Sequence, residues 1–359
     1  MSRPPQSRPP TAHDVARLAG VSQAAVSRAF SPKASIAPAT KAAVLQAAEE
    51  LGYRPNLLAR SLIMRRSRLV GIAMAYMEHQ FYPQVLEQLS ERLRAEGYQT
   101  MLHAGALSDS VEPRLEDVLN YGVDALVLAS THLSSTLARR ARAAGVPVVL
   151  FNRTTDDPDA SSVTGDNRRG ADVIAQFLAA AGHRRMAYVA GLESASTNRD
   201  REAGFRAGLA ALGLPPPLRA VGDYSSTGAA EATRQLLSHA DRPDAIFYAN
   251  DHMALAGMEV ARHAFGLTIP DDLSIVGFDD VGPARWPSFA LTSYAQPLGP
   301  MVEATVELLM RALSGEGTAP EHVVVPGRLV VRRSARLPVA GVTDIGGTLT
   351  WTPEAAGIS

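Results

Sequence analysis

The stretch Ala12–Phe30, AHDVARLAGVSQAAVSRAF, constrains the fold of this chain more than any other segment. Its apolar residues recur with helical spacing on both sides of Gly20, which predicts one short helix over Asp14–Ala19 and another over Gln23–Phe30. Gly20 permits a tight joint because glycine enters the left-handed region without a steric penalty. Ser22 is a favourable N-cap for the second helix. The pattern therefore predicts a helix-turn-helix, whose second helix would lie in the major groove of DNA.

An ordinary pair of antiparallel helices would fit the same pattern, so the surrounding sequence decides between the two interpretations. A third amphipathic helix is predicted over Pro38–Gly52, with Val44, Leu45, Ala48 and Leu51 on one face. Residues 1–68 contain 11 Lys or Arg and only 3 acidic residues, a formal charge of +8, whereas the rest of the chain carries −9. A basic head on an acidic body favours a nucleic-acid-binding module.

The segments TAHDVARLAGVSQAAVSRAF, PATKAAVLQAAEELGYRPN and LLARSL resemble the DNA-binding headpiece of the lactose-repressor family of bacterial transcription regulators. The resemblance implies a helix-turn-helix DNA-binding domain over 11–55 after a disordered tail, 1–10. It also implies a hinge helix and linker over 56–68, from which Leu62 enters the minor groove. The residues that this resemblance assigns to DNA contact are Thr11, Ser22, Gln23, Ala24, Ala25, Ser27, Arg28, Asn56, Ala59 and Leu62. One departure is Ala37, where the family often has a serine cap for the third helix.

From Leu69 onward, short apolar segments with strand character alternate with amphipathic segments of helical character. Near-continuous apolar strands that alternate with helices indicate parallel sheets covered on both faces. Two such series predict an α/β fold. We expect an all-α headpiece followed by two doubly wound parallel-sheet subdomains, similar to periplasmic binding proteins, with a cleft between them.

The resemblance implies that residues 69–337 form the effector-binding and dimerisation domain, in which the chain crosses between the halves three times. The first half would comprise about 69–165 and 297–326, and the second about 166–296 and 327–337. Residues 338–359 are rich in Gly, Thr and Pro, so we expect a flexible tail. Some members of the family end in an apolar heptad helix that makes tetramers, and this segment has no such heptad, so the resemblance implies a homodimer.

Ligands of doubly wound folds bind beyond the carboxyl ends of the strands, where polar and aromatic residues gather in this sequence. The candidates for effector contact are Phe81, Asn152, Arg201, Tyr224, Asn250 and Asp279. Arg201, Asn250 and Asp279 match the family's ligand-binding arginine, asparagine and aspartate. Asn152 departs from the family because several members have Asp there. The resemblance implies a sugar or a sugar derivative as effector, with a purine or a nucleoside as the alternative.

Several other classes of protein fit the sequence less well. The chain contains no cysteine, and its nine histidines are scattered without metal-binding spacing, so we expect neither a metal nor a cofactor. It lacks the common nucleotide-binding, zinc-protease and nucleophile-elbow motifs of enzymes. A solute-binding protein of transport would need export, and the start of the chain lacks a signal-peptide pattern. We therefore predict a cytoplasmic repressor that binds a palindromic operator, responds to a small molecule and has no membrane partner.

Overall fold

The computed structural model describes residues 8–30, 35–54, 66–74, 77–104, 118–129, 135–157, 159–316 and 319–358. The chain divides into two compact units, Met1–Ser67 and Arg68–Ser359. The predicted hinge residues Asn56, Ala59 and Leu62 lie outside the described residues. Among the residues that are described, no helix is long and apolar enough to cross a membrane.

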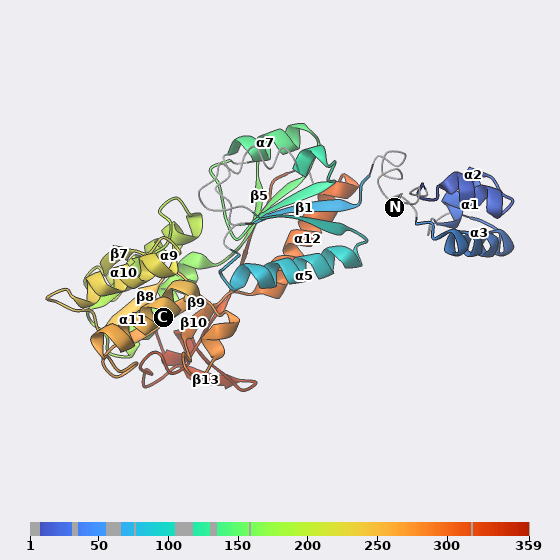
Figure 1. Cartoon of the computed structure of the whole chain (residues 1–359). Coiled ribbons are helices and arrows are strands. Elements are labelled where there is room, and N and C mark those ends of the chain that lie inside the picture. The colour runs from blue at the N-terminus through green and yellow to red at the C-terminus, as the bar shows by residue number, and fades with distance from the viewer. Residues whose placement is uncertain are drawn as a thin grey trace, which may run out of the picture. The chain divides into compact units, whose positions relative to one another are not determined.

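The first unit contains three helices, α1 (Ala12–Leu18), α2 (Gln23–Ala29) and α3 (Pro38–Leu51) (Figure 1). Gly20 joins α1 to α2 with a φ of 67°, in the left-handed region that the sequence predicted. Ser22 caps α2, because its hydroxyl oxygen accepts a hydrogen bond from the amide of Ala25 at 3.2 Å. These local features form the tight joint of a helix-turn-helix.

The core of this unit is small and made mostly of valine and alanine. Its buried members are Val15, Ala16, Val26, Ala29, Val44, Ala47 and Ala48. Leu45, which the sequence placed on the apolar face of α3, is instead 43% exposed. Successive helical residues are rotated by about 100°, so burial of Val44 turns Leu45 toward the flank. Ala37 provides no side-chain cap for α3, and Pro38 occupies its first turn.

The second unit contains two sheets, each covered by helices on both faces (Figure 1). The first sheet has the order β11-β5-β4-β3-β1-β2, and all its pairs are parallel. Its strands are β1 (Leu69–Met74), β2 (Gln99–Ala104), β3 (Ala125–Ala129), β4 (Val148–Phe151), β5 (Ser161–Gly165) and β11 (His322–Val325). Helices α5 (Phe81–Ala95) and α12 (Leu298–Ser314) cover one face, and α7 (Ser135–Ala143) covers the other. We call this sheet and these helices the first subdomain.

The second sheet has the order β13-β14-β12-β10-β9-β8-β6-β7. Its strands are β6 (Met186–Ala190), β7 (Leu218–Val221), β8 (Ala245–Tyr248), β9 (Ser274–Asp279), β10 (Thr292–Ala295), β12 (Arg328–Val330), β13 (Val342–Ile345) and β14 (Thr348–Trp351). Its helices are α8 (Asn167–Ala180), α9 (Ser196–Ala211), α10 (Ser226–Leu237) and α11 (Asp251–Phe265), with short 3₁₀ turns η1 (Gly282–Arg285) and η2 (Glu354–Ala356). Helix α8 packs on α9, and α10 packs on α11. We call this part the second subdomain.

The chain crosses between the two sheets three times, after β5, after β10 and after β11. The α/β fold with two doubly wound subdomains is therefore confirmed. Strand β5 was not predicted, because SSVTG contains a single large apolar residue. Val163, the central residue of β5, is fully buried, and β5 pairs with β4 and β11 on its two sides. Tertiary pairing thus makes a strand from a weak local pattern.

The prediction of a flexible tail over residues 338–359 is wrong. Strands β13 and β14 form an antiparallel hairpin that extends the second sheet through β12. Trp351 anchors the hairpin: it is 1% exposed, and its ring lies edge-on to Phe177 of α8 with centroids 5.6 Å apart. Its indole N–H donates to the carbonyl of Ala340 at 2.9 Å. Strand pairing and a buried aromatic side chain together hold a segment whose composition is otherwise typical of a loop.

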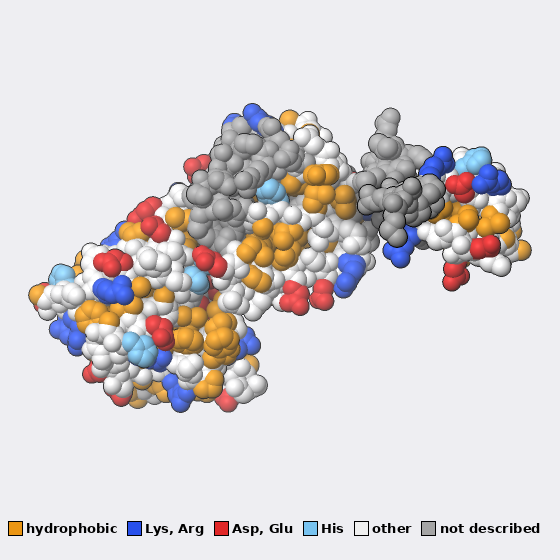
Figure 2. Space-filling view, viewed as in Figure 1, with side chains coloured by type: hydrophobic (Ala, Val, Ile, Leu, Met, Phe, Trp, Pro, Cys, Tyr) orange, Lys and Arg blue, Asp and Glu red, His pale blue; other side chains and the backbone are white. Residues whose placement is uncertain are grey.

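Acidic and basic side chains are interspersed on the visible surface of the second unit (Figure 2). The net charge of −9 that the sequence assigns to residues 69–359 is thus not gathered into one acidic patch on this face.

Candidate ligand pocket and recognition helix

A pocket lies at the carboxyl ends of the parallel strands, and residues of both subdomains line it. The lining residues are His79, Tyr82, Asn152 and Arg153 from the first subdomain, and Thr197, Arg201, Tyr224, Asn250 and Asp279 from the second. The space between protein atoms at this place is about 320 Å³, a figure that includes space open to solvent.

The structure brings together five of the six residues that the sequence singled out for effector contact. The exception is Phe81, which is 3% exposed and belongs to the hydrophobic core. Its neighbour Tyr82 lines the pocket instead. Both are in the first turn of α5, where the side chains of successive residues point in directions about 100° apart. The prediction that Phe81 contacts the effector is therefore wrong, because its side chain belongs to the hydrophobic core.

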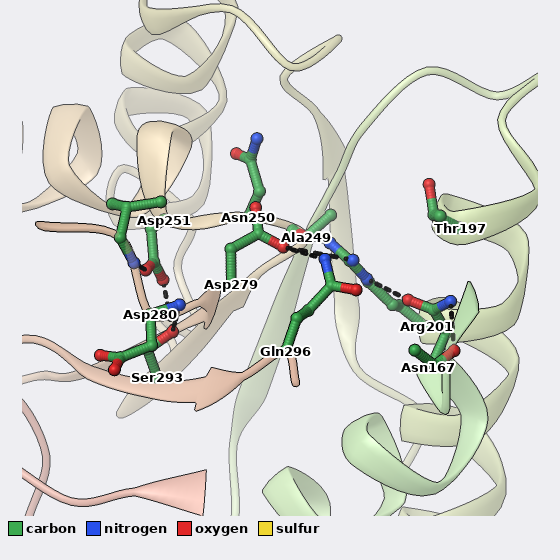
Figure 3. A network of polar contacts seen from close by, with 12 residues as sticks. Asn167, Thr197, Arg201, Ala249, Asn250, Asp251, Asp279, Asp280, Ser293 and Gln296 are labelled. Atoms are coloured by element: carbon green, nitrogen blue, oxygen red, sulfur yellow. Dashed lines mark hydrogen bonds and ion pairs between the residues drawn. The ribbon is translucent and has the colours of Figure 1, made fainter. Parts of the chain in front are cut away.

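Arg201 is the most constrained charged residue of the pocket. It is 2% exposed, and its guanidinium carbon lies 3.7 Å from the centroid of the Phe278 ring. Its Nε donates to Asn167 Oδ1 at 2.8 Å, and another nitrogen donates to the carbonyl oxygen of Ala249. The third nitrogen reaches Asp279 Oδ1 at 3.3 Å (Figure 3). These contacts fix the planar fork of the guanidinium, so its orientation toward a ligand is set in advance.

Helix α9 can hold Arg201 at this place because Gly204 lets it approach α8 closely. A Cβ atom at Gly204 would lie 2.2 Å from the carbonyl oxygen of Arg168. No side chain fits that gap, so a glycine is required one turn after the arginine.

Asp279 is the acceptor that faces Arg201. The side-chain amide of Gln296 donates to the same Oδ1 at 2.8 Å, and Figure 3 shows both donors converging on it. Burial raises the pKa of Asp279, and the positive charge of Arg201 opposes this shift. A buried carboxylate with a paired oxygen keeps its other oxygen as an acceptor for ligand donors.

Unusual backbone conformations cluster around the pocket. Asn152, Tyr224 and Asp279 have φ values of 54°, 55° and 113°. Asn and Asp tolerate positive φ, but it is rare for a bulky residue such as Tyr224. The hydroxyl of Tyr224 is 3.1 Å from that of Thr197, and its carbonyl accepts a hydrogen bond from His79 Nε2 at 2.7 Å. Strained residues of this kind persist where surrounding contacts over-determine them, as at functional sites.

Two asparagines place amide groups at the pocket. Asn250 caps α11, since its Oδ1 accepts a hydrogen bond from the amide of Met253 at 3.0 Å. This contact leaves the amide nitrogen as the polar atom that can serve a ligand. Asn152 is 4% exposed, and its Oδ1 has no hydrogen-bond partner among the described residues. A buried acceptor without a partner is costly, so it calls for a donor such as a ligand hydroxyl.

Tyr82 and Arg153 follow predicted strands and line the pocket, whereas the sequence did not identify His79 and Thr197 as pocket residues. Thr197 was missed because α9 begins at Ser196, and Ala195 at its N-cap position has no side chain that would signal the start of a helix. Burial, with the neighbouring His252 adding to it, lowers the pKa of His79 to about 4, so this imidazole is neutral at physiological pH. No local sequence pattern indicates that His79 lines the pocket, because its neighbours there, such as Tyr224, are far along the chain.

In the first unit, α2 presents an exposed surface that can read DNA. Ser22, Gln23, Ala24, Ser27 and Arg28 are exposed, whereas Val26 is buried. Thr11 and Ala25, also predicted to contact DNA, are half-buried. The Arg28 Nε donates to the carbonyl of Ala24 at 3.2 Å, one turn earlier. The N-terminus of α2 therefore exposes Ser22, Gln23 and Ala24, at the end of the helix that contacts base edges in a recognition helix.

Comparison with known proteins adds independent evidence. Residues 11–56 match the bacterial regulatory proteins of the lacI family, and residues 175–335 match a periplasmic binding protein-like domain. The chain is 34% identical over 336 residues to the HTH-type transcriptional regulator CelR of Thermobifida fusca, with 91% of this chain and 98% of that protein covered. It is 30% identical to the ribose operon repressor of Escherichia coli (strain K12), with 90% and 99% covered.

Solved structures agree with these relatives. The lac repressor dimer bound to operator and the anti-inducer ONPF has a TM-score of 0.81 at 28% identity, with 91% of this chain and 99% of that chain covered. The complex of CelR with cellobiose has a TM-score of 0.70 at 33% identity, with 91% and 100% covered. The named relatives are transcriptional regulators, and they share both units with this chain. The chain therefore belongs to the LacI family of bacterial regulatory proteins.

Proposed function

We propose that this LacI-family regulator represses transcription from a palindromic operator and that a sugar or sugar derivative in the pocket controls its operator affinity. The observation that carries the proposal is the convergence of polar side chains from both subdomains on one buried pocket. A ligand held by both subdomains binds one of their arrangements better than others, and so shifts the population toward it.

The chemistry of the pocket suits a ligand rich in hydroxyl groups. Each sugar hydroxyl both donates and accepts hydrogen bonds, so it needs partners of both kinds. Arg201 and the amide of Asn250 supply donors. Asp279 and the unpaired Oδ1 of Asn152 supply acceptors. Tyr82 and Tyr224 add aromatic surface for the less polar faces of a sugar ring.

The relatives favour the same class of ligand. The solved complex of CelR contains cellobiose, and another relative is the repressor of a ribose operon. We infer that the chain acts in the cytoplasm and as a homodimer; the lac repressor bound to operator is a dimer. A two-fold dimer would recognise two inverted half-sites. Insertion of Leu62 at the centre of the operator remains a prediction from the family resemblance.

A thermal-shift screen of the full chain against monosaccharides, disaccharides, purine bases and nucleosides tests the ligand class. A ligand that binds only the native state raises the unfolding midpoint in proportion to its saturation. We expect a sugar to raise the midpoint and the same sugar to change operator affinity. A shift produced by purines or nucleosides alone would overturn the assignment to sugars and support the alternative.

A further inference from the structure

Two histidines that are far apart in the sequence meet beside the pocket, one from each subdomain. His79 lies in the loop between β1 and α5, and His252 is in the first turn of α11. Their ring centroids are 4.6 Å apart, with an angle of 34° between the ring planes. Glu78, which precedes His79, brings a carboxylate to the same place. The candidate ligand atoms of Glu78, His79 and His252 all lie within 4.8 Å of one another.

The hydrogen bonds of the two imidazoles are those of metal-ligating histidines. Nε2 of His79 is 2.7 Å from the carbonyl oxygen of Tyr224, which can only accept, so Nε2 carries the proton and Nδ1 carries the lone pair. Nε2 of His252 is 2.8 Å from the hydroxyl of Ser226, which can accept in the same manner. Histidines that bind metals almost always donate their other ring N–H to a carbonyl, carboxylate or similar acceptor, which orients the ring.

From this geometry we propose that Glu78, His79 and His252 form a site for a divalent transition-metal ion of the zinc class, which ties the two subdomains together. Two imidazoles and one carboxylate are a common protein ligand set for Zn²⁺, with a fourth position left for water or another ligand. Imidazole ligands select against Mg²⁺ and Ca²⁺, which prefer oxygen. The protein carries no cysteine that would compete for the ion.

To bind such an ion, the donor atoms must approach one another from separations of up to 4.8 Å. Zn–N bonds of about 2.0–2.1 Å in a tetrahedral site place the donor atoms about 3.3 Å apart. Glu78 is exposed, so its side chain can rotate to close the distance. His79 is 4% exposed and packs near Tyr224, with ring centroids 6.2 Å apart, so it supplies the fixed part of the site.

The site would act on the arrangement of the subdomains. Glu78 and His79 belong to the first subdomain, whereas His252 and the carbonyl of Tyr224 belong to the second. An ion that binds all three side chains therefore stabilises the arrangement in which they meet. Because His79 also lines the ligand pocket, binding of the ion and binding of the effector are coupled, and the coupling must be reciprocal. The identity of the effector does not enter this inference.

Isothermal titration of the full chain with Zn²⁺, without a histidine tag, tests the proposal. We expect saturable binding of one ion per chain and no comparable binding of Mg²⁺. His79→Ala and His252→Ala should each weaken Zn²⁺ binding by more than about 100-fold, because loss of a ligand costs more than loss of a ligand's hydrogen-bond partner. Ser226→Ala, which removes only the partner of His252, should weaken it by about 10–100-fold. His263→Ala is the matched control, since His263 is on the same helix but its side chain is 75% exposed.

Thermal unfolding with Zn²⁺ or with EDTA provides the second measurement. Zn²⁺ should raise the midpoint of the wild-type chain and of His263→Ala, but not that of the other histidine variants. Glu78→Gln changes an exposed side chain and should fold normally while losing affinity, which guards against misfolding of His79→Ala. Unsaturable binding to the wild-type chain, or equal binding by wild type, His79→Ala and His252→Ala, would overturn the proposal. So would variants whose midpoints differ from wild type equally in Zn²⁺ and in EDTA.

Discussion

At the scale of single residues, the pocket combines structural and ligand-binding roles in the same side chains. Arg201 holds Asn167, the Ala249 carbonyl and Asp279 while it faces the pocket. Asn250 caps α11 with its oxygen and presents its nitrogen. Substitution to alanine therefore mixes two effects, and conservative variants are needed to separate them.

Asn250 offers such a separation. Serine is as good an N-cap as asparagine, so Asn250→Ser should leave the unfolding midpoint in urea nearly unchanged, whereas Asn250→Ala should cost about 1 kcal/mol. Both variants lose the amide nitrogen and should therefore lose affinity for the effector to a similar extent. The measurements are urea unfolding and effector titration. If Asn250→Ser kept wild-type effector affinity, Asn250 would be a helix cap only.

His183 should make the stability of the second subdomain sensitive to acid. The side chain is fully buried between Asp244 Oδ1, at 3.2 Å, and Ser274 Oγ, at 2.9 Å. Burial lowers the pKa of His183, with Arg336 and Arg184 acting in the same direction and Asp244 opposing them. The unfolded chain then binds more protons than the native one. The contribution of His183 to stability is therefore complete at pH values above the pKa of an unfolded histidine, about 6.5. It is lost as the pH falls from there toward the lower native pKa.

Substitution by asparagine tests this assignment, because asparagine can still donate to Asp244 but does not titrate. His183→Asn should be less stable than wild type at pH 8 by about 1–3 kcal/mol, owing to lost packing and the lost bond to Ser274. Between pH 8 and pH 5.5, however, it should lose less stability than wild type does. Urea midpoints at both pH values give the comparison. Equal losses would show that other groups cause the acid sensitivity.

At the scale of elements, the recognition helix α2 is expected to choose the DNA sequence. Gln23 and Ala24 are exposed in its first turn. Glutamine can bond adenine bidentately, and alanine leaves space for a thymine methyl. Selection of operators from random DNA by Gln23→Ala should change the preferred base at one position in each half-site. An identical consensus for variant and wild type would exclude Gln23 from base recognition.

The C-terminal hairpin is expected to contribute to the stability of the second subdomain. Trp351→Ala removes a buried side chain and should destabilise by about 3–5 kcal/mol. Val339 lies in the same segment but is fully exposed, so Val339→Ala is the matched control and should have no effect. Thermal unfolding of both variants provides the test. Equal midpoints for Trp351→Ala and wild type would restore the view that this segment is a flexible tail.

The sequence predicted those elements whose signals are local. For strands with continuous apolar runs, such as Ala125–Ala129 and Met186–Ala190, the bounds expected from the sequence agree with those in the structure. The ends of such strands placed Asn152, Tyr224 and Asp279 correctly beside one pocket. Strand β5 and the hairpin of β13 and β14 were missed because their stability comes from pairing with distant strands. The meeting of His79 and His252 depends on the apposition of two subdomains, which no local pattern encodes.

At the scale of the whole molecule, three crossings join two subdomains that share one pocket. Arg68 begins the second unit and leads directly into β1 of the first subdomain. Its amide donates to Asp124 Oδ2 at 3.0 Å, and its guanidinium lies 5.0 Å from the ring centroid of Tyr98. The covalent path from the DNA-binding unit thus enters the subdomain that supplies Asn152 and His79. A ligand that changes how this subdomain meets its partner can alter the operator affinity through that path.

The most direct test of the account is operator affinity measured across an effector titration at fixed salt, since DNA affinity depends steeply on salt. The wild-type chain should show a change of about 5–150-fold at saturating effector, the range typical of coupled sites. Arg201→Lys keeps the charge but loses the planar fork, so the titration midpoint should move to higher effector concentration. Arg206→Lys is the matched control, since Arg206 lies on the same helix but bonds to Glu202 rather than lining the pocket. Its titration should follow wild type. A wild-type operator affinity that no pocket ligand changes, or an Arg201→Lys variant with the wild-type midpoint and amplitude, would contradict the account.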